Sequence, residues 1–168
     1  MFITEFTRLV DLNIPHLRMI IEEKFNIPCW QQGLSPYPAP DTVRDLASAT
    51  DTSINEILKK IQTIKKLTHN IEIASRELGD INHISQNYFL LDIRPDWSLT
   101  SQFIRGSRFL SSENPTSLIA EVKRADKVLL VCESGFRSFS GALYLRELGQ
   151  GKTYSLKGGL KALYLSRA

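Results

Sequence analysis

Two continuous apolar runs constrain the fold of this chain most. They are Tyr88 to Ile93 (YFLLDI) and Lys127 to Cys132 (KVLLVC). Runs of this length and composition are typical of strands that are buried on both faces of a parallel sheet. Because parallel strands need a crossover connection, the helical pattern of residues 115–125 between them predicts a crossover helix.

The same alternation continues after the second run. Residues 138–148 carry apolar side chains at helical spacing and are followed by a glycine, which is a common helix terminator. Residues 153–156 predict a further short strand, and Gly158-Gly159 precedes a last helical segment. The order strand, helix, strand, helix, strand predicts an α/β domain with a parallel sheet over about residues 71–168.

The preceding part of the chain, residues 1–67, predicts a small all-helical domain. Two capping-box patterns, Thr42-x-x-Asp45 and Ser53-x-x-Glu56, each mark the start of a helix. A first helix and a proline-rich loop are expected before them. A chain of 168 residues has room for one ordinary domain and a small additional one.

Composition excludes several functional classes. No apolar run approaches the roughly 20 residues that cross a bilayer, and the start, Met1 to Glu5, lacks a secretory pattern. The two cysteines and three histidines have neither a disulfide framework nor metal-ligand spacing, which favours a reducing, cytoplasmic location. The net charge is +3, and the basic stretch of residues 150–168 is too small for a nucleic-acid footprint. We therefore expect neither a membrane nor a nucleic acid as partner.

The candidate site follows the second apolar run. Cys132 ends that predicted strand, and a short loop leads from it into a helix; in open α/β sheets this edge is where ligands bind. Backbone N–H groups of such a loop and the helix N-terminus favour an anion, so the sulfur is expected as a nucleophilic thiolate. Gly135 permits a tight loop, and Arg137 adds a cation to its rim. The alternative is an inert buried cysteine.

Four motifs, in order, resemble those of the rhodanese family. The loop CESGFRS resembles the active-site loop of that family, in which a cysteine is followed by a helix. The other three are Asp92-Ile93-Arg94, similar to the family's Asp-Val-Arg, Ile104-x-Gly106, similar to its Ile-Pro-Gly, and Leu156-x-Gly158-Gly159, similar to its closing Gly-Gly element.

The resemblance implies a sulfurtransferase. Cys132 would take a sulfane sulfur from thiosulfate or a persulfide, hold it as a persulfide, and pass it to a thiol or other nucleophilic acceptor, without an organic cofactor or metal. The loop residues implied to bind substrate are Glu133, Ser134, Gly135, Phe136, Arg137 and Ser138. The residues implied to support the site are Asp92, Arg94, Gly158 and Gly159, the first two more as a pair that fixes the strand end than as catalytic groups. Only four residues separate Cys132 from Arg137, and the longer loop of related phosphatases suits phosphate instead.

Three departures from the family concern substrate recognition. Glu133 stands where a basic residue is common, Phe103 stands where histidine is common, and residues 95–97 replace an acidic stretch. A carboxylate about 6 Å from an incoming anion costs roughly 1 to 3 kcal/mol per unit charge at an effective dielectric constant of about 20. Thiosulfate, a dianion, is therefore expected to be a poorer donor than a persulfide.

A basic segment near the end of the chain predicts an acidic protein partner. Lys152, Lys157 and Lys161 flank the Gly-Gly element, which the resemblance places beside the active loop. Such a surface can recruit a partner of opposite charge.

The N-terminal residues resemble, more weakly, a small helical domain of uncharacterised function that is often linked to redox proteins. The similar segments are Ile27-Pro28-Cys29 and Thr42-Val43-x-x-Leu46-Ala47 leading into Ile54-x-x-Ile57-Leu58. Gln32 stands where that family has a second cysteine, which excludes a disulfide within the domain. Cys29 is then either an inert thiol or a second, relay or resolving thiol that faces Cys132.

Two functional hypotheses remain at this point. The first is a sulfurtransferase with a helical docking or regulatory domain. The second is a non-enzymatic rhodanese-fold module that senses or binds, with Cys132 oxidised or persulfidated as a signal. The presence of Cys132, Gly135 and Arg137 together favours the first, because a module without catalysis does not need all three.

Overall fold

The chain divides between His69 and Asn70 into two units in a computed structural model. Each unit is described here by itself. The described residues are 2–27, 40–80, 83–95, 104–110 and 115–166.

The first unit is helical. Its elements are η1 (Leu9–Leu12), α1 (Leu17–Phe25), α2 (Val43–Ala49) and α3 (Ile54–Thr68). Both predicted capping boxes are confirmed, because the side chains of Thr42 and Ser53 each accept the N–H three residues later while that residue's carboxylate accepts the N–H of the cap. Most of the predicted proline-rich loop lies outside the described residues.

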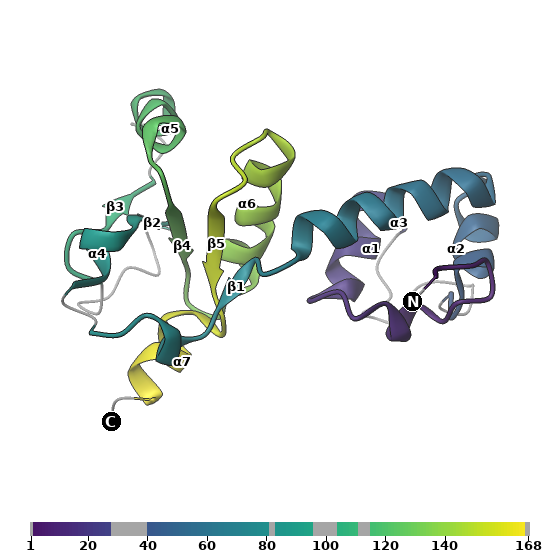
Figure 1. The fold of residues 1–168 in the computed structure, drawn as a ribbon, viewed down its shortest axis with the longest axis horizontal. Helices are drawn as coiled ribbons and strands as arrows, with labels where there is room; N and C mark the ends of the chain where they lie inside the picture. Colours follow the sequence, from purple (N-terminus) through teal and green to yellow (C-terminus); the bar gives the residue numbers. More distant parts are fainter. Residues whose placement is uncertain (1, 28–39, 81–82, 96–103, 111–114, 167–168) are drawn as a thin grey trace. The chain divides into compact units, whose positions relative to one another are not determined.

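The second unit is built on a parallel sheet, which confirms the predicted α/β class (Figure 1). Across the sheet the described strands are β1 (Glu72–Ile73), β5 (Thr153–Leu156), β4 (Val128–Val131), β2 (Phe89–Asp92) and β3 (Arg108–Phe109). All neighbouring strands pair in parallel, and β4 lies between β5 and β2. The described helices of this unit are η3 (Ser75–Glu77), α4 (Ile84–Asn87), α5 (Pro115–Arg124), α6 (Phe136–Glu147) and α7 (Gly159–Leu165).

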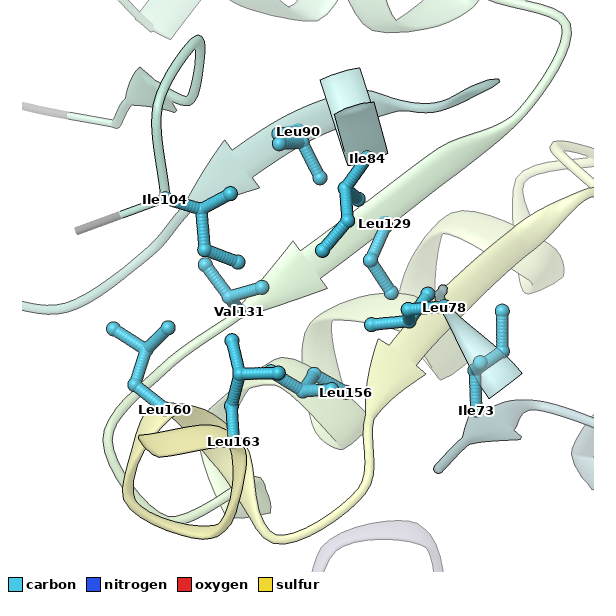
Figure 2. Packing of buried hydrophobic residues seen from close by; sticks show 10 residues of the cluster. All are labelled: Ile73, Leu78, Ile84, Leu90, Ile104, Leu129, Val131, Leu156, Leu160 and Leu163. Carbon is cyan, nitrogen blue, oxygen red and sulfur yellow. The ribbon is translucent and has the colours of Figure 1, made fainter. Parts of the chain in front are cut away.

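The central strand β4 is buried on both faces of the sheet. Val128 and Leu130 pack in one apolar cluster with residues of α5, whereas Leu129 and Val131 pack in another with residues of α4 and α7. Figure 2 shows the second cluster, in which side chains from strands and helices meet. This burial explains why β4 reads as a continuous apolar run, and it fixes the position of the residue that follows the strand.

Among the described strands and α-helices, three short elements were not predicted. The strands β1 and β3 are two residues each, and α4 is a single turn. Segments this short contain too few residues for a period, and their structure depends on pairing with a neighbour, as Glu72 pairs with Ser155 and Leu91 with Arg108. None of the described helices combines the length and apolar character that a membrane crossing requires.

Candidate active site

Cys132 lies at the carboxyl end of β4, where the chain enters the loop before α6. Its side chain is buried, with 4% exposed. The backbone N–H groups of Gly135 and Ser138 donate to its Sγ over 3.2 and 3.3 Å. Two amide donors aimed at one sulfur, one of them in the first turn of a helix, favour a negative charge there. The geometry is suited to a thiolate or to the inner sulfur of a persulfide.

The Gly-Gly element supports this loop. The N–H groups of Leu160 and Lys161, in the first turn of α7, donate to the carbonyl oxygens of Cys132 and Glu133 over 2.9 and 3.1 Å. Gly159 has φ +65°, and a Cβ at this position would lie 2.4 Å from both carbonyl oxygens. No other residue fits here without displacing the loop.

We expect Gly159→Ala to destabilise the chain by about 2 to 3 kcal/mol, from a left-handed backbone and an overpacked contact together. The rate of alkylation of Cys132 should fall as well, because the loop must move. The matched control is Gly149→Ala, which has φ +93° but open space around the added Cβ. Urea unfolding and alkylation should show a clearly larger effect at Gly159; equal effects at the two glycines would contradict the role of the contact.

Asp92 and Arg94 form a buried ion pair at the end of β2. Arg94 Nη2 donates to Asp92 Oδ2 over 2.7 Å, and Nε and the backbone N–H of Arg94 also donate to this carboxylate. The side-chain hydrogen bonds to Asp92 raise the pKa of the Arg94 guanidinium above its ordinary value, although its burial opposes them. Arg94 therefore keeps its charge, and the pair is shaped to fix the strand end.

Glu133 does not stand alone at the loop. Its carboxylate is more than half exposed, and Oε2 lies 3.8 Å from Nη1 of Arg94. The sequence presents Glu133 as an isolated carboxylate, but the structure places beside it the guanidinium of Arg94. Because Asp92 already pairs with this guanidinium, the field of Glu133 is reduced only in part. Arg137 is exposed, and its Nη1 donates to the carbonyl oxygen of Ile93 over 3.4 Å. Glu133 and Arg137 thus each link the loop to the segment that follows β2.

The other residues predicted for the site are placed as follows. Ser134 and Phe136 are exposed, while Gly135 and Ser138 are buried. Cys29 and Phe103 lie outside the described residues, as do Asp96 and Trp97. Within the described part of the chain, no group of histidine, cysteine and carboxylate side chains is arranged to hold a metal ion.

The sequence predicts one basic segment beside the loop, but β5 separates Lys152 from Lys157 and Lys161. Lys152 precedes β5, at the amino ends of the strands, and its side chain donates to Asp126 Oδ1 over 2.6 Å. Cys132 follows the carboxyl end of β4. Lys157 and Lys161 follow β5 and are exposed. Of the three lysines, only these two therefore lie at the carboxyl ends of the strands, where the loop lies.

Sequence reasoning missed Ser155. It lies in β5, is fully buried, and its Oγ is 2.9 Å from Oγ of Ser138. The available signal was a serine within a short run predicted to be a buried strand, where a hydroxyl needs a partner.

The second unit is similar to a known protein family and to several named proteins. Residues 72–165 match the family model of the Rhodanese-like domain. A sulfurtransferase of Allochromatium vinosum is 28% identical over 91 residues, which are 54% of this chain and 85% of the relative. The thiosulfate sulfurtransferase GlpE of Shewanella oneidensis is 33% identical over 79 residues, which are 47% of this chain and 78% of the relative. The crystal structure of a rhodanese homolog from Thermus thermophilus has 26% identity and a TM-score of 0.40, covering 55% of this chain and 99% of that one.

Proposed function

The chain belongs to the rhodanese-like family, and we propose that Cys132 carries sulfane sulfur as a persulfide and passes it to a thiol or other nucleophilic acceptor. The observation that carries this proposal is the pair of backbone N–H groups that donate to Cys132 Sγ. The sulfurtransferase names of the relatives support the reaction class.

The proposed reaction has two displacements at sulfur. The Cys132 thiolate attacks the outer sulfur of the donor, a sulfur–sulfur bond forms to Sγ, and the donor's own sulfur–sulfur bond breaks. The electron pair leaves with the donor, as a thiolate from a persulfide or as sulfite from thiosulfate. An acceptor thiolate then attacks the outer sulfur on Cys132, which returns as a thiolate. The amides of Gly135 and Ser138 stabilise the negative charge that Sγ carries before the first transfer and regains in the second.

Cyanide provides the test of turnover. With a sulfane donor present, the protein should form thiocyanate repeatedly and in proportion to its concentration. The alternative, a non-enzymatic module that uses Cys132 as a redox or persulfide signal, would add nothing to the steady rate at which donor and cyanide form thiocyanate without protein.

Charge at the loop favours a persulfide donor over thiosulfate. Arg94 is already paired with Asp92 and lies beside Glu133, so its positive charge is largely compensated before any substrate arrives. The exposed carboxylate of Glu133 opposes a dianion more than it opposes a persulfide, which can carry its bulk outside the loop.

We expect Glu133→Arg to raise kcat/KM for thiosulfate by about tenfold at low salt, equivalent to about 1.4 kcal/mol of transition-state stabilisation. The value for a small persulfide should change much less. The matched control is Glu147→Arg, the same charge reversal at the far end of α6 from the loop. Unchanged thiosulfate kinetics in Glu133→Arg, or an equal gain in the control, would contradict the donor argument.

The remaining parts of the chain are proposed to serve recognition. Lys157 and Lys161 follow the carboxyl end of β5, on the same side of the sheet as the loop, and offer positive charge to an acidic protein partner. The match to the Rhodanese-like domain begins at residue 72, so the helical unit is additional to it, and we propose for that unit a docking or regulatory role.

A further inference from the structure

Ser138 has three neighbours for its single hydroxyl proton. Its Oγ lies 3.3 Å from Cys132 Sγ, 3.0 Å from the carbonyl oxygen of Gly135 and 2.9 Å from Oγ of Ser155. Both serine side chains are fully buried, so their hydroxyls are arranged by the protein and not by bulk water. The direction of the Ser138 proton therefore depends on the protonation of Cys132 and on Ser155.

The carbonyl oxygen of Gly135 does not need the Ser138 hydroxyl. It already accepts the backbone N–H of Phe139 over 3.0 Å, the first hydrogen bond of α6. Ser138 can therefore turn from that oxygen toward the sulfur without leaving a buried acceptor unsatisfied.

The hydrogen bonds must reverse when Cys132 ionises. As a thiol, Cys132 donates to Oγ of Ser138, which donates onward. As a thiolate it can only accept, so Ser138 can donate to Sγ, and its own oxygen is then open to the hydroxyl of Ser155. The other acceptor near Ser155 Oγ is the carbonyl oxygen of Gly135, which is farther away at 3.5 Å. A hydroxyl that accepts a hydrogen bond becomes a better donor, and the effect is strongest in a buried network.

We propose that Ser155 is a positioning residue that directs the Ser138 hydroxyl toward the Cys132 thiolate. The inference rests on the proposed role of Cys132 as the nucleophile and assigns Ser155 no contact with substrate. Ser155 is suited to this role by its place in the sheet, because β5 lies beside β4 and Ser155 is in register with Leu130, two residues before Cys132.

The test is the pH dependence of alkylation of Cys132 by iodoacetamide, with its peptide distinguished from that of Cys29 by mass spectrometry. Ser155→Ala should slow alkylation at neutral pH by about threefold, because the thiolate loses support from its hydroxyl donor. At high pH, where all chains carry the thiolate, the two rates should be equal. Ser155→Thr, which keeps a hydroxyl, should restore the neutral rate.

Two controls separate positioning from packing. Thr153→Val removes another buried hydroxyl from β5, one that donates to the carbonyl oxygen of Gln150, and should leave the profile unchanged. In a Ser138→Ala background, Ser155→Ala should have no further effect, because Ser155 acts through Ser138. An unchanged profile in Ser155→Ala, equal slowing at all pH values, or a further effect in the Ser138→Ala background would overturn the proposal. Because alkylation needs no sulfur donor, these outcomes are independent of whether the chain transfers sulfur.

Discussion

Serine in place of Cys132 is expected to lower sulfur transfer by more than about a thousandfold, equivalent to at least about 4 kcal/mol of lost transition-state stabilisation. The hydroxyl is close in shape to the thiol and can still accept the N–H groups of Gly135 and Ser138. It cannot form a persulfide, so the reaction has no intermediate. Steady-state thiocyanate formation with a persulfide donor measures the loss.

Urea unfolding must accompany that measurement. The Cys132→Ser chain should unfold within about 1 kcal/mol of the natural one, because the substitution nearly preserves volume. Cys29→Ser is the matched control, since it removes the other cysteine and leaves Cys132 available for loading. Undiminished turnover in Cys132→Ser would remove the assignment of this residue.

Asparagine in place of Asp92 is expected to destabilise the chain by about 3 to 5 kcal/mol, the usual cost of breaking a buried ion pair by removing one partner. Only 1% of Arg94 is exposed, and its hydrogen bonds to Asp92 include the backbone as well as the side chain. Asparagine keeps the shape of the side chain but not its charge. The more exposed carboxylate of Glu133, 3.8 Å from Arg94, is a weaker substitute.

The matched control for Asp92→Asn is Asp126→Asn. Asp126 pairs with Lys152 over 2.6 Å, about as close as Asp92 to Arg94, but both side chains are mostly exposed. Its loss should change the free energy of unfolding far less, because water replaces the partner. Urea unfolding of both variants decides the matter, and similar losses at the two sites would show that the burial of the Asp92–Arg94 pair is not what stabilises it.

The strand β4 and the starts of two helices in the first unit were predictable because their sequence signals are local. The strand β4 is buried on both faces and reads as an apolar run, and the two capping boxes bring their partners together within three residues of the chain. The start of α6 was predicted two residues late, because Gly135, with φ +90°, begins the helix directly at Phe136.

Contacts between strands and across the sheet were not predictable in the same way. Lys152 and Lys157 are close in sequence, but β5 lies between them, so Lys152 lies at the amino end of this strand and Lys157 at its carboxyl end. The approach of Glu133 to Arg94 and the contact of Ser138 in α6 with Ser155 in β5 each join two parts of the chain that are distant in sequence. Such neighbours follow from strand order, which periodicity does not reveal.

The central claim, that Cys132 carries the transferred sulfur, is tested most directly by peptide mass spectrometry after incubation with a persulfide and removal of excess donor. We expect the peptide that contains Cys132 to gain the mass of one sulfur atom, and cyanide to remove it with release of one thiocyanate per loaded chain. An unmodified Cys132 peptide in a preparation that still turns over donor, or added sulfur found only on Cys29, would contradict the account.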